Sequence, residues 1–356
     1  MKIAEIDRNF YVASSLDKNG IRFYNALQEP IQVYGVFMEN GKFRRLPEKT
    51  AESVSQGVYA LHANTAGGRV RFRTDSPFVA ISAQMENIGK MSHFALTGSA
   101  GFDLYETIDG IETYCCTFTP PFDQETGYES KRELGSQKMR EITIHFPLYS
   151  DVKCLQIGLH PQASVEPASA YRISAPVVYY GSSITQGGCA SRPGNSYQAM
   201  ISRRLHCDYV NLGFSGSAMA ETEMTSYIAS LQMSCFVMDY DHNAPTVEYL
   251  RETHERMFRT IRAAHPVLPI VLMSRPKARL TAEECERLEV IRQTYHHALA
   301  AGDQSVYLLD GKDLTALCGN EGTVDNSHPT DFGFASMAQA LGNLLETIGI
   351  FRNAVG

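Results

Sequence analysis

The spacing of hydrophobic residues changes part-way along this 356-residue chain. Up to about residue 165, apolar residues alternate with polar or small ones, as they do in the segment 79–85. A period of two predicts strands that bury one face. Asp109-Gly110 separates two such segments, 103–108 and 111–118, and this dipeptide is typical of a tight hairpin.

The many short strands and frequent turns predict an antiparallel β-sandwich or jelly roll in the N-terminal half. A short piece near Glu52 is the one stretch there that suggests a helix. Residues 161–170 are rich in Pro, Ala and Ser and have no apolar period, which is typical of a connection. We therefore expect a β-sandwich domain at 1–165 and a second domain at 172–356, because a chain of this length usually forms two domains.

Beyond this connection, short apolar runs alternate with segments of helical period. The helical segments carry apolar residues three and four apart, and Thr281 with Glu284 has the spacing of a capping box. Alternating strands and helices predict a parallel sheet with helices on both faces, which is a three-layer α/β fold. The expected strands are 177–180, 209–212, 235–239, 270–273 and 306–309.

The first of these strands leads into the most informative segment of the chain. Four large β-formers at 177–180 indicate a strand that is buried on both faces. The run ends at Gly181, and Ser182 and Ser183 follow at once. This exit places a serine hydroxyl at the carboxyl edge of the sheet, where α/β proteins carry their chemistry. Serines at such positions also often do no more than cap the next helix.

Further polar residues follow other strands at the same edge, because all strands of a parallel sheet run the same way. Gly216 follows the second strand and Asn243 the third, while Asp325 and His328 follow the last. With Ser183 they make the set that acyl transfer needs: a nucleophile, a base, a carboxylate that orients the base, and oxyanion donors. Each of them alone is more often a turn or loop residue, but their joint placement favours a catalytic site.

Each residue type suits its part in that chemistry. A serine hydroxyl needs a base within hydrogen-bond reach, and histidine is the best matched. An aspartate three residues before a histidine can accept its Nδ1–H across one turn, and Asp325 and His328 have this spacing. Glycine lets a backbone N–H approach a developing oxyanion, and an asparagine amide can donate to the same oxygen.

In these segments the chain resembles the SGNH hydrolases, also called GDSL esterases, whose four blocks are named for Ser, Gly, Asn and His. The four blocks occur here in the family's order. The matching segments are Gly181–Thr185, Asn211–Gly216, Asp241–Asn243 and Asp325–Pro329. The resemblance covers about the C-terminal half of the chain and implies a serine esterase of the three-layer α/β fold.

The resemblance also implies a role for each residue of the site. Ser183 would be the nucleophile, His328 the base and Asp325 its partner. The backbone N–H groups of Ser183 and Gly216 and the side chain of Asn243 would form the oxyanion hole. An ester would then be hydrolysed through an acyl-enzyme, without a cofactor and without a metal ion.

Two positions depart from the family's pattern, and a second motif extends the resemblance. Ser182 stands where Asp usually precedes the nucleophile, and Asp241 stands where Gly usually lies two residues before the Asn. Gly101-Phe-Asp103-Leu-Tyr105 is similar to the Gly-x-Asp-Leu-Tyr motif of a β-sandwich domain that precedes a subset of these esterases. Such proteins are often grouped with carbohydrate esterases, which implies an acylated, in particular acetylated, carbohydrate or another small ester as substrate.

Arg192, Asp241 and His242 lie in loops beside the four blocks and are candidate substrate-binding residues.

Composition and charge limit the classes of partner that the protein can bind. The net charge of −7 argues against a nucleic-acid or anionic-membrane partner. The N-terminus carries acids where a signal peptide needs an apolar core, and no apolar run is long enough to span a bilayer. We therefore expect a soluble, cytoplasmic protein whose partner is a small-molecule or glycan ester.

Other classes of protein fit less well. The α/β-hydrolase elbow needs Gly-x-Ser-x-Gly, and Thr185 takes the place of the second glycine. No phosphate-binding glycine motif follows the first strand. A metal site at Asp239, Asp241 and His242 lacks a second histidine at helical spacing. Two alternatives stay open: an acyltransferase that uses the same Ser-His-Asp site, and a catalytically silent carbohydrate-binding protein.

Overall fold

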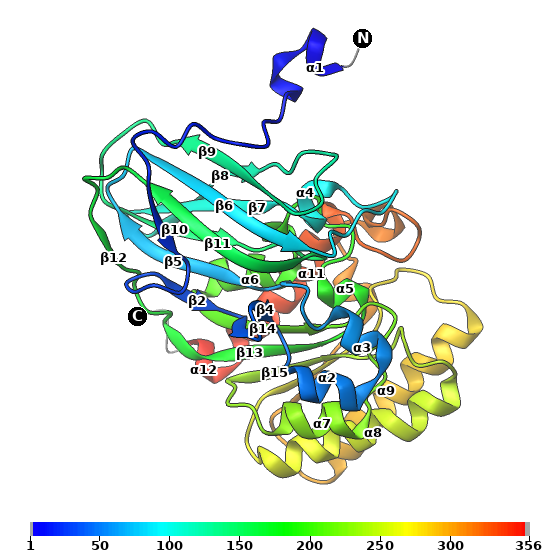
Figure 1. The fold of residues 1–356 in the computed structure, drawn as a ribbon. Coiled ribbons are helices and arrows are strands. Elements are labelled where there is room, and N and C mark those ends of the chain that lie inside the picture. Colours follow the sequence, from blue (N-terminus) through cyan, green and yellow to red (C-terminus); the bar gives the residue numbers. More distant parts are fainter. Residues whose placement is uncertain (1–2, 353–356) are drawn as a thin grey trace.

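The computed structural model describes residues 3–352, which form two parts (Figure 1). Most strands of the N-terminal part form two antiparallel sheets that share one core. The strands of the C-terminal part form one parallel sheet between helices. The three-layer α/β fold preceded by an antiparallel sandwich, predicted from the hydrophobic pattern, is therefore confirmed.

The sandwich consists of a sheet in the order β1-β11-β6-β9 and a sheet in the order β12-β5-β10-β7-β8, with β2 beside β5. Alternate residues such as Ile81, Leu104 and Ile144 point into the core between them. The strands are β1 Arg22–Asn25, β2 Gln32–Tyr34, β5 Arg69–Thr74, β6 Phe78–Glu86, β7 Phe102–Ile108, β8 Ile111–Phe118, β9 Gly127–Glu133, β10 Arg140–His145, β11 Asp151–Leu159 and β12 Val165–Pro167; a small hairpin has β3 Phe37–Glu39 and β4 Lys42–Arg44.

The hairpin predicted at Asp109-Gly110 is the turn between β7 and β8, and both turn residues have positive φ. The helix predicted near Glu52 is α2 (Glu48–Val54), which α3 (Gln56–Leu61) follows. Figure 1 shows both helices beside the parallel sheet, far from most of the sandwich, and α2 packs against α7 (Thr222–Ala229). Further short helices are α1 Ile3–Ile6, η1 Arg8–Phe10 and α4 Leu96–Ser99.

The parallel sheet has the order β14-β13-β15-β16-β17. Its strands are β13 Ile173–Gly181, β14 Cys207–Gly213, β15 Cys235–Asp239, β16 Ile270–Met273 and β17 Val306–Leu309. The remaining helices are α5 Ser183–Gln186, η2 Pro193–Asn195, α6 Tyr197–Leu205, α8 Val247–Ala264, α9 Ala282–Ala300, α10 Gly311–Leu314, η3 Gly319–Gly322, α11 Asp331–Thr347 and α12 Gly349–Arg352.

Strand β13 is buried on both faces, as its apolar run predicts. Val177 and Tyr179 belong to the core beneath α6 and α11, whereas Val178 and Tyr180 belong to the core beneath α7, α8 and α9. β14 lies on one side of β13 and β15 on the other. The chain thus reverses direction across the sheet at β13, and a crevice at the carboxyl ends of the strands is expected at such a switch point.

Within residues 3–352, no helix is both long enough and apolar enough to span a bilayer.

Candidate active site

The two adjacent serines after β13 have different surroundings. Ser182 is the N-cap of α5, and its Oγ accepts a hydrogen bond from a backbone N–H of the helix. Ser183 is the first residue of α5, so its side chain is not used for capping. Gly181 is required before them, because a Cβ there would collide with Thr185 Oγ1 and with the carbonyl of Asp239. The close approach of strand and helix therefore fixes where Ser183 lies.

Ser183, His328 and Asp325 form a continuous chain of hydrogen bonds. Ser183 Oγ lies 2.9 Å from His328 Nε2, and His328 Nδ1 lies 2.7 Å from Asp325 Oδ2. The other oxygen of Asp325 accepts the backbone N–H groups of Ser327 and His328, at 3.0 and 2.7 Å. The structure thus brings together three residues that the sequence places up to 145 positions apart.

The environment of Asp325 favours its ionised form. Partial burial acts to raise the pKa of this carboxyl, but the hydrogen bonds from His328 and from two backbone N–H groups outweigh burial and hold the pKa below its ordinary value. An ionised Asp325 accepts the Nδ1–H of His328, so the lone pair of Nε2 is directed at the Ser183 hydroxyl. This is the tautomer that a general base for a serine needs.

The candidate oxyanion donors follow β13, β14 and β15. The N–H of Ser183 is the first of α5 and has no acceptor within the helix. Gly216 has a φ of 66°, and nothing lies within 4 Å of where its Cβ would stand, so its backbone faces open space. Asn243 Oδ1 accepts the backbone N–H of Ala218 at 3.3 Å, which orients the amide and leaves Nδ2 as donor. Donors of these types are the ones that an oxyanion hole uses, and the role of these three in it stays a prediction.

Asp241, at the position where the family usually has glycine, is paired with Arg275. The buried Asp241 carboxylate accepts Arg275 Nη2 at 2.6 Å, Nε at 3.1 Å and the backbone N–H at 3.2 Å. Burial acts to raise the pKa of Asp241, but Arg275 holds it below the ordinary value. The pair joins the loops after β15 and β16, and a contact between Asp241 and substrate stays a prediction.

Burial lowers the pKa of the neighbouring His242 to about 4, so this imidazole is neutral at pH 7. Within the described part of the chain, its Nε2 is buried and has no hydrogen-bond partner. Asp239 is the third residue of the metal site that the sequence analysis considered, with Asp241 and His242. Its carboxylate accepts hydrogen bonds from Thr185 Oγ1 at 2.8 Å and from the Tyr197 hydroxyl at 3.3 Å. The two carboxylates of that set thus have protein donors as partners.

Comparison with known protein families shows which family has this arrangement of residues. Residues 174–346 match the GDSL-like lipase/acylhydrolase family, and residues 21–165 match the GxDLY family, the N-terminus of SGNH-hydrolase-type esterases. The chain's C-terminal part is a GDSL-family acylhydrolase domain. No curated protein matches its sequence significantly.

Solved structures share the whole architecture of this acylhydrolase at low sequence identity. A GDSL-like lipase from Bacteroides ovatus ATCC 8483 superposes with a TM-score of 0.82 at 24% identity, over 92% of this chain and 97% of its own. A salicylyl-acyltransferase from a tetracycline biosynthetic pathway gives 0.75 at 19% identity, over 93% and 98%. A family two carbohydrate esterase from Cellvibrio japonicus gives 0.61 at 13% identity, over 93% and 98%. At these identities the likeness shows a shared fold.

The Gly-x-Asp-Leu-Tyr motif of this acylhydrolase holds the loop that follows Ser183 and α5. Arg192 donates to Asp103 Oδ2 at 2.9 Å and to the hydroxyl of Tyr105, and the N–H of Gly194 donates to Asp103 at 2.8 Å. The carboxylate of Asp103 is fully buried between the two parts of the chain. Arg192, predicted as a substrate contact, thus has a partner within the protein, and its contact with substrate stays a prediction.

The sandwich also supplies residues at the site that sequence reasoning missed. The ring centroid of His93, in the β6–α4 loop, lies 5.8 Å from that of His328. The Tyr149 hydroxyl donates to the carbonyl of Ser183 at 3.3 Å. No local motif marks either residue, because both come from the other half of the chain. Only the packing of the two parts against each other brings them to Ser183 and His328.

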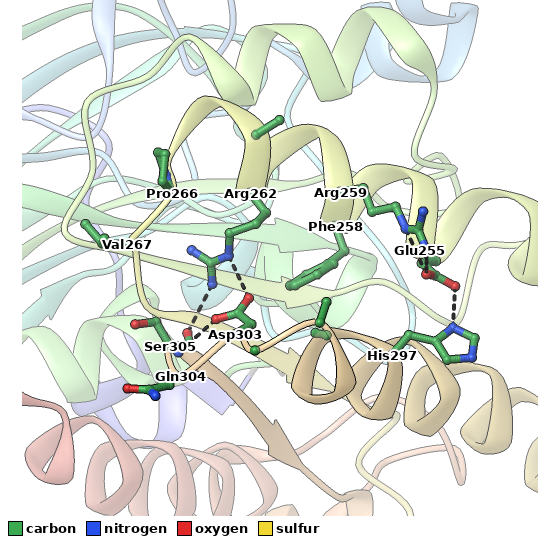
Figure 2. A pocket seen from close by; sticks show the side chains of 14 residues that line it. Glu255, Phe258, Arg259, Arg262, Pro266, Val267, His297, Asp303, Gln304 and Ser305 are labelled. Carbon is green, nitrogen blue, oxygen red and sulfur yellow. Dashed lines mark hydrogen bonds and ion pairs between the residues drawn. The ribbon is translucent and has the colours of Figure 1, made fainter.

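A cavity of about 860 Å³ lies away from this site, between the C-terminal ends of α8 and α9 (Figure 2). Arg262 pairs there with Asp303 at 2.7 Å, and His297 with Glu255 at 2.9 Å. The segments that enter β16 and β17 line it, so the cavity lies at the amino edge of the sheet, opposite the triad. The triad itself lies at the surface, with the side chains of His328 and Asp325 26% and 36% exposed.

Proposed function

We propose that this acylhydrolase cleaves the ester of an acylated, in particular acetylated, carbohydrate through an acyl-enzyme on Ser183. His328 takes the proton of the serine hydroxyl as it attacks the ester carbonyl, and later gives it to the leaving alkoxide. Asp325 stabilises the imidazolium. The donors on Ser183, Gly216 and Asn243 hold the oxyanion, and a water activated by His328 then releases the acid.

The observation that carries this proposal is the unbroken Ser183–His328–Asp325 chain, with 2.9 and 2.7 Å between its atoms. A serine without such a base is a poor nucleophile at neutral pH. A carbohydrate-binding protein without activity would have no need to keep a serine, a histidine and an aspartate in this geometry. The hydrogen-bonded chain of Ser183, His328 and Asp325 therefore supports an active enzyme over the binding-only alternative.

Two further observations support the choice of acceptor and substrate. The triad side chains are partly exposed, so water can reach an acyl group on Ser183, which favours hydrolysis over transfer. The carbohydrate as alcohol is supported by the architecture shared with the family two carbohydrate esterase. The architecture is also shared with the salicylyl-acyltransferase, so transfer is the alternative that the assay must include.

The two adjacent serines allow a matched test of the nucleophile. We expect Ser183→Ala to lower the hydrolysis of a short-chain aryl ester by roughly 10⁴-fold or more, with an unchanged circular dichroism spectrum. Ser182→Ala, which removes only the helix cap, should keep activity and lose about 1 kcal/mol of stability. Near-normal turnover by the Ser183 variant would rule out the mechanism.

The substrate class is tested with acetylated sugars and aryl esters of rising chain length, each with and without an acceptor alcohol. The proposal predicts fastest release of acetate from acetylated sugars, and free acid as product even with the acceptor present. An acylated acceptor as main product would favour the transferase. No reaction across the panel would favour the binding-only protein.

A further inference from the structure

Three metal-ligating side chains meet at the mouth of the proposed active site. They are His93 from the sandwich, Cys189 from the loop after α5, and His328 of the triad. Their ligand atoms, one from each residue, all lie within 4.8 Å of one another. His93 is exposed and the other two are partly buried, so an ion from solvent can reach all three.

The backbones that carry His93 and Cys189 are fixed against each other by α4. Phe94, directly after His93, is buried in the core of the α/β part and packs edge-on against Tyr149 at 5.2 Å. Gly98 of α4 lies so close to the carbonyl of Ala190, next to Cys189, that a Cβ would collide with it. Thr97 Oγ1 donates to the carbonyl of Ser191 at 2.6 Å. The two donors are therefore held near each other before any ion binds.

The donor set selects a class of ion. Two imidazoles and a thiolate suit Zn²⁺ and its tetrahedral substitute Co²⁺, with water in the fourth position. The three ligand atoms must come about 1 Å closer to one another to surround such an ion at bonding distance. A rotation of the exposed His93 side chain can bring them that close. Asp325 binds Nδ1 of His328, as in carboxylate–histidine–zinc units, so Nε2 is the nitrogen left to bind an ion, which would replace the hydrogen bond from Ser183.

We propose that His93, Cys189 and His328 form an inhibitory Zn²⁺ site that switches this esterase off. Zinc bound to His328 Nε2 takes the lone pair that would accept the proton of Ser183. Burial, with a smaller contribution from the charge of Asp325, raises the pKa of the Cys189 thiol to about 11, so the thiol keeps its proton until zinc displaces it to solvent. Binding of the ion is independent of the proposed function, whereas inhibition rests on it.

The experiment measures binding and inhibition separately on chelator-treated full-length protein. Adding Co²⁺ should give the near-ultraviolet thiolate-to-cobalt absorption, and Zn²⁺ should abolish it by competition. Zn²⁺ should also lower aryl ester hydrolysis at least about ten-fold at saturation, with recovery on adding chelator. We expect Cys189→Ala to lose the absorption and His93→Ala to weaken it, and each to raise the zinc concentration for half-inhibition by roughly 10- to 100-fold.

Matched controls exclude metal binding elsewhere on the surface. Cys285→Ala and His296→Ala remove an exposed cysteine and an exposed histidine of α9 and should leave the absorption and the half-inhibition concentration as in the wild type. Absence of the thiolate–cobalt band in the wild type would overturn the proposal. So would an unchanged half-inhibition concentration in both the Cys189 and the His93 variant. If the aryl ester is not hydrolysed at all, the cobalt spectrum still tests the site.

Discussion

The orientation of Asn243 depends on one hydrogen bond, from the backbone N–H of Ala218 to its Oδ1. We expect Asn243→Ala to lower kcat by roughly 10²- to 10³-fold with little change in KM, because the lost amide donates only to the charge that develops in the transition state. Steady-state kinetics on a short-chain aryl ester measure both constants. Asn243→Asp, which keeps the shape and removes the donor, should behave alike. A change in KM alone would remove Asn243 from the oxyanion hole.

Residues of the site differ in how far the sequence could reveal them. Ser183, Gly216 and Asn243 each follow a strand directly, and the parallel direction of the strands alone places them at one edge. His328 follows β17 only after α10 and η3, so the order of the family's blocks, and not the strand direction alone, predicts its place there. His93 lies in a loop of the sandwich and carries no motif, so its place beside His328 depends on how the two parts pack. Such long-range packing leaves no pattern in a single sequence.

At the scale of elements, the strands that are buried on both faces were the easiest to predict. β15, β16 and β17 have the bounds expected from their apolar runs. β15 and β16 are central strands of the parallel sheet and need continuous apolar residues, whereas β17 is an edge strand with an equally short apolar run. β14 begins two residues before the predicted strand and includes Asp208, whose carboxylate pairs with Arg69 of the sandwich. That polar residue interrupts the apolar signal, and its partner is 139 positions away.

Two loops at the site are joined by the pair of Asp241 and Arg275, whose side chains are 1% and 13% exposed. We expect Asp241→Asn to lower the free energy of unfolding by about 2 kcal/mol, because the largely buried guanidinium of Arg275 loses one of its two carboxylate partners and keeps only Glu284, at 2.9 Å. Glu166→Gln breaks the Glu166–Arg73 pair, whose side chains are almost half exposed, and should cost less than about 1 kcal/mol because solvent screens it. Urea unfolding compares the two, and equal losses would contradict the argument.

Across the whole molecule, the two parts share their cores. Leu46, Ala51 and Val58 pack in the same apolar cluster as the α7–α8 face of the parallel sheet. Phe94 and Leu148 belong to the cluster on the other face. The fully buried Arg45 donates to the carbonyls of residues 61, 64, 211 and 213, which lie on both sides of the predicted boundary. The division at 165–172 stays a prediction about the chain's organisation, and the packing shows how closely the parts depend on each other.

This shared packing leads to a prediction for chains that lack the sandwich. A chain that starts at residue 172 would expose the faces of Val178 and Tyr179 that residues 46–66 and 94–149 now help to cover. We expect it to aggregate or to bind a hydrophobic dye, and to show no cooperative thermal unfolding, because burial of apolar area is the main stabilising term. The described side chains that a chain starting at residue 13 would lack include the exposed Ile6 and Phe10, and we expect this chain to unfold like the chain of 356 residues. A monomeric, cooperatively unfolding and active 172–356 fragment would show that the sandwich is dispensable, and that its contacts with the nucleophile loop do not hold the site together.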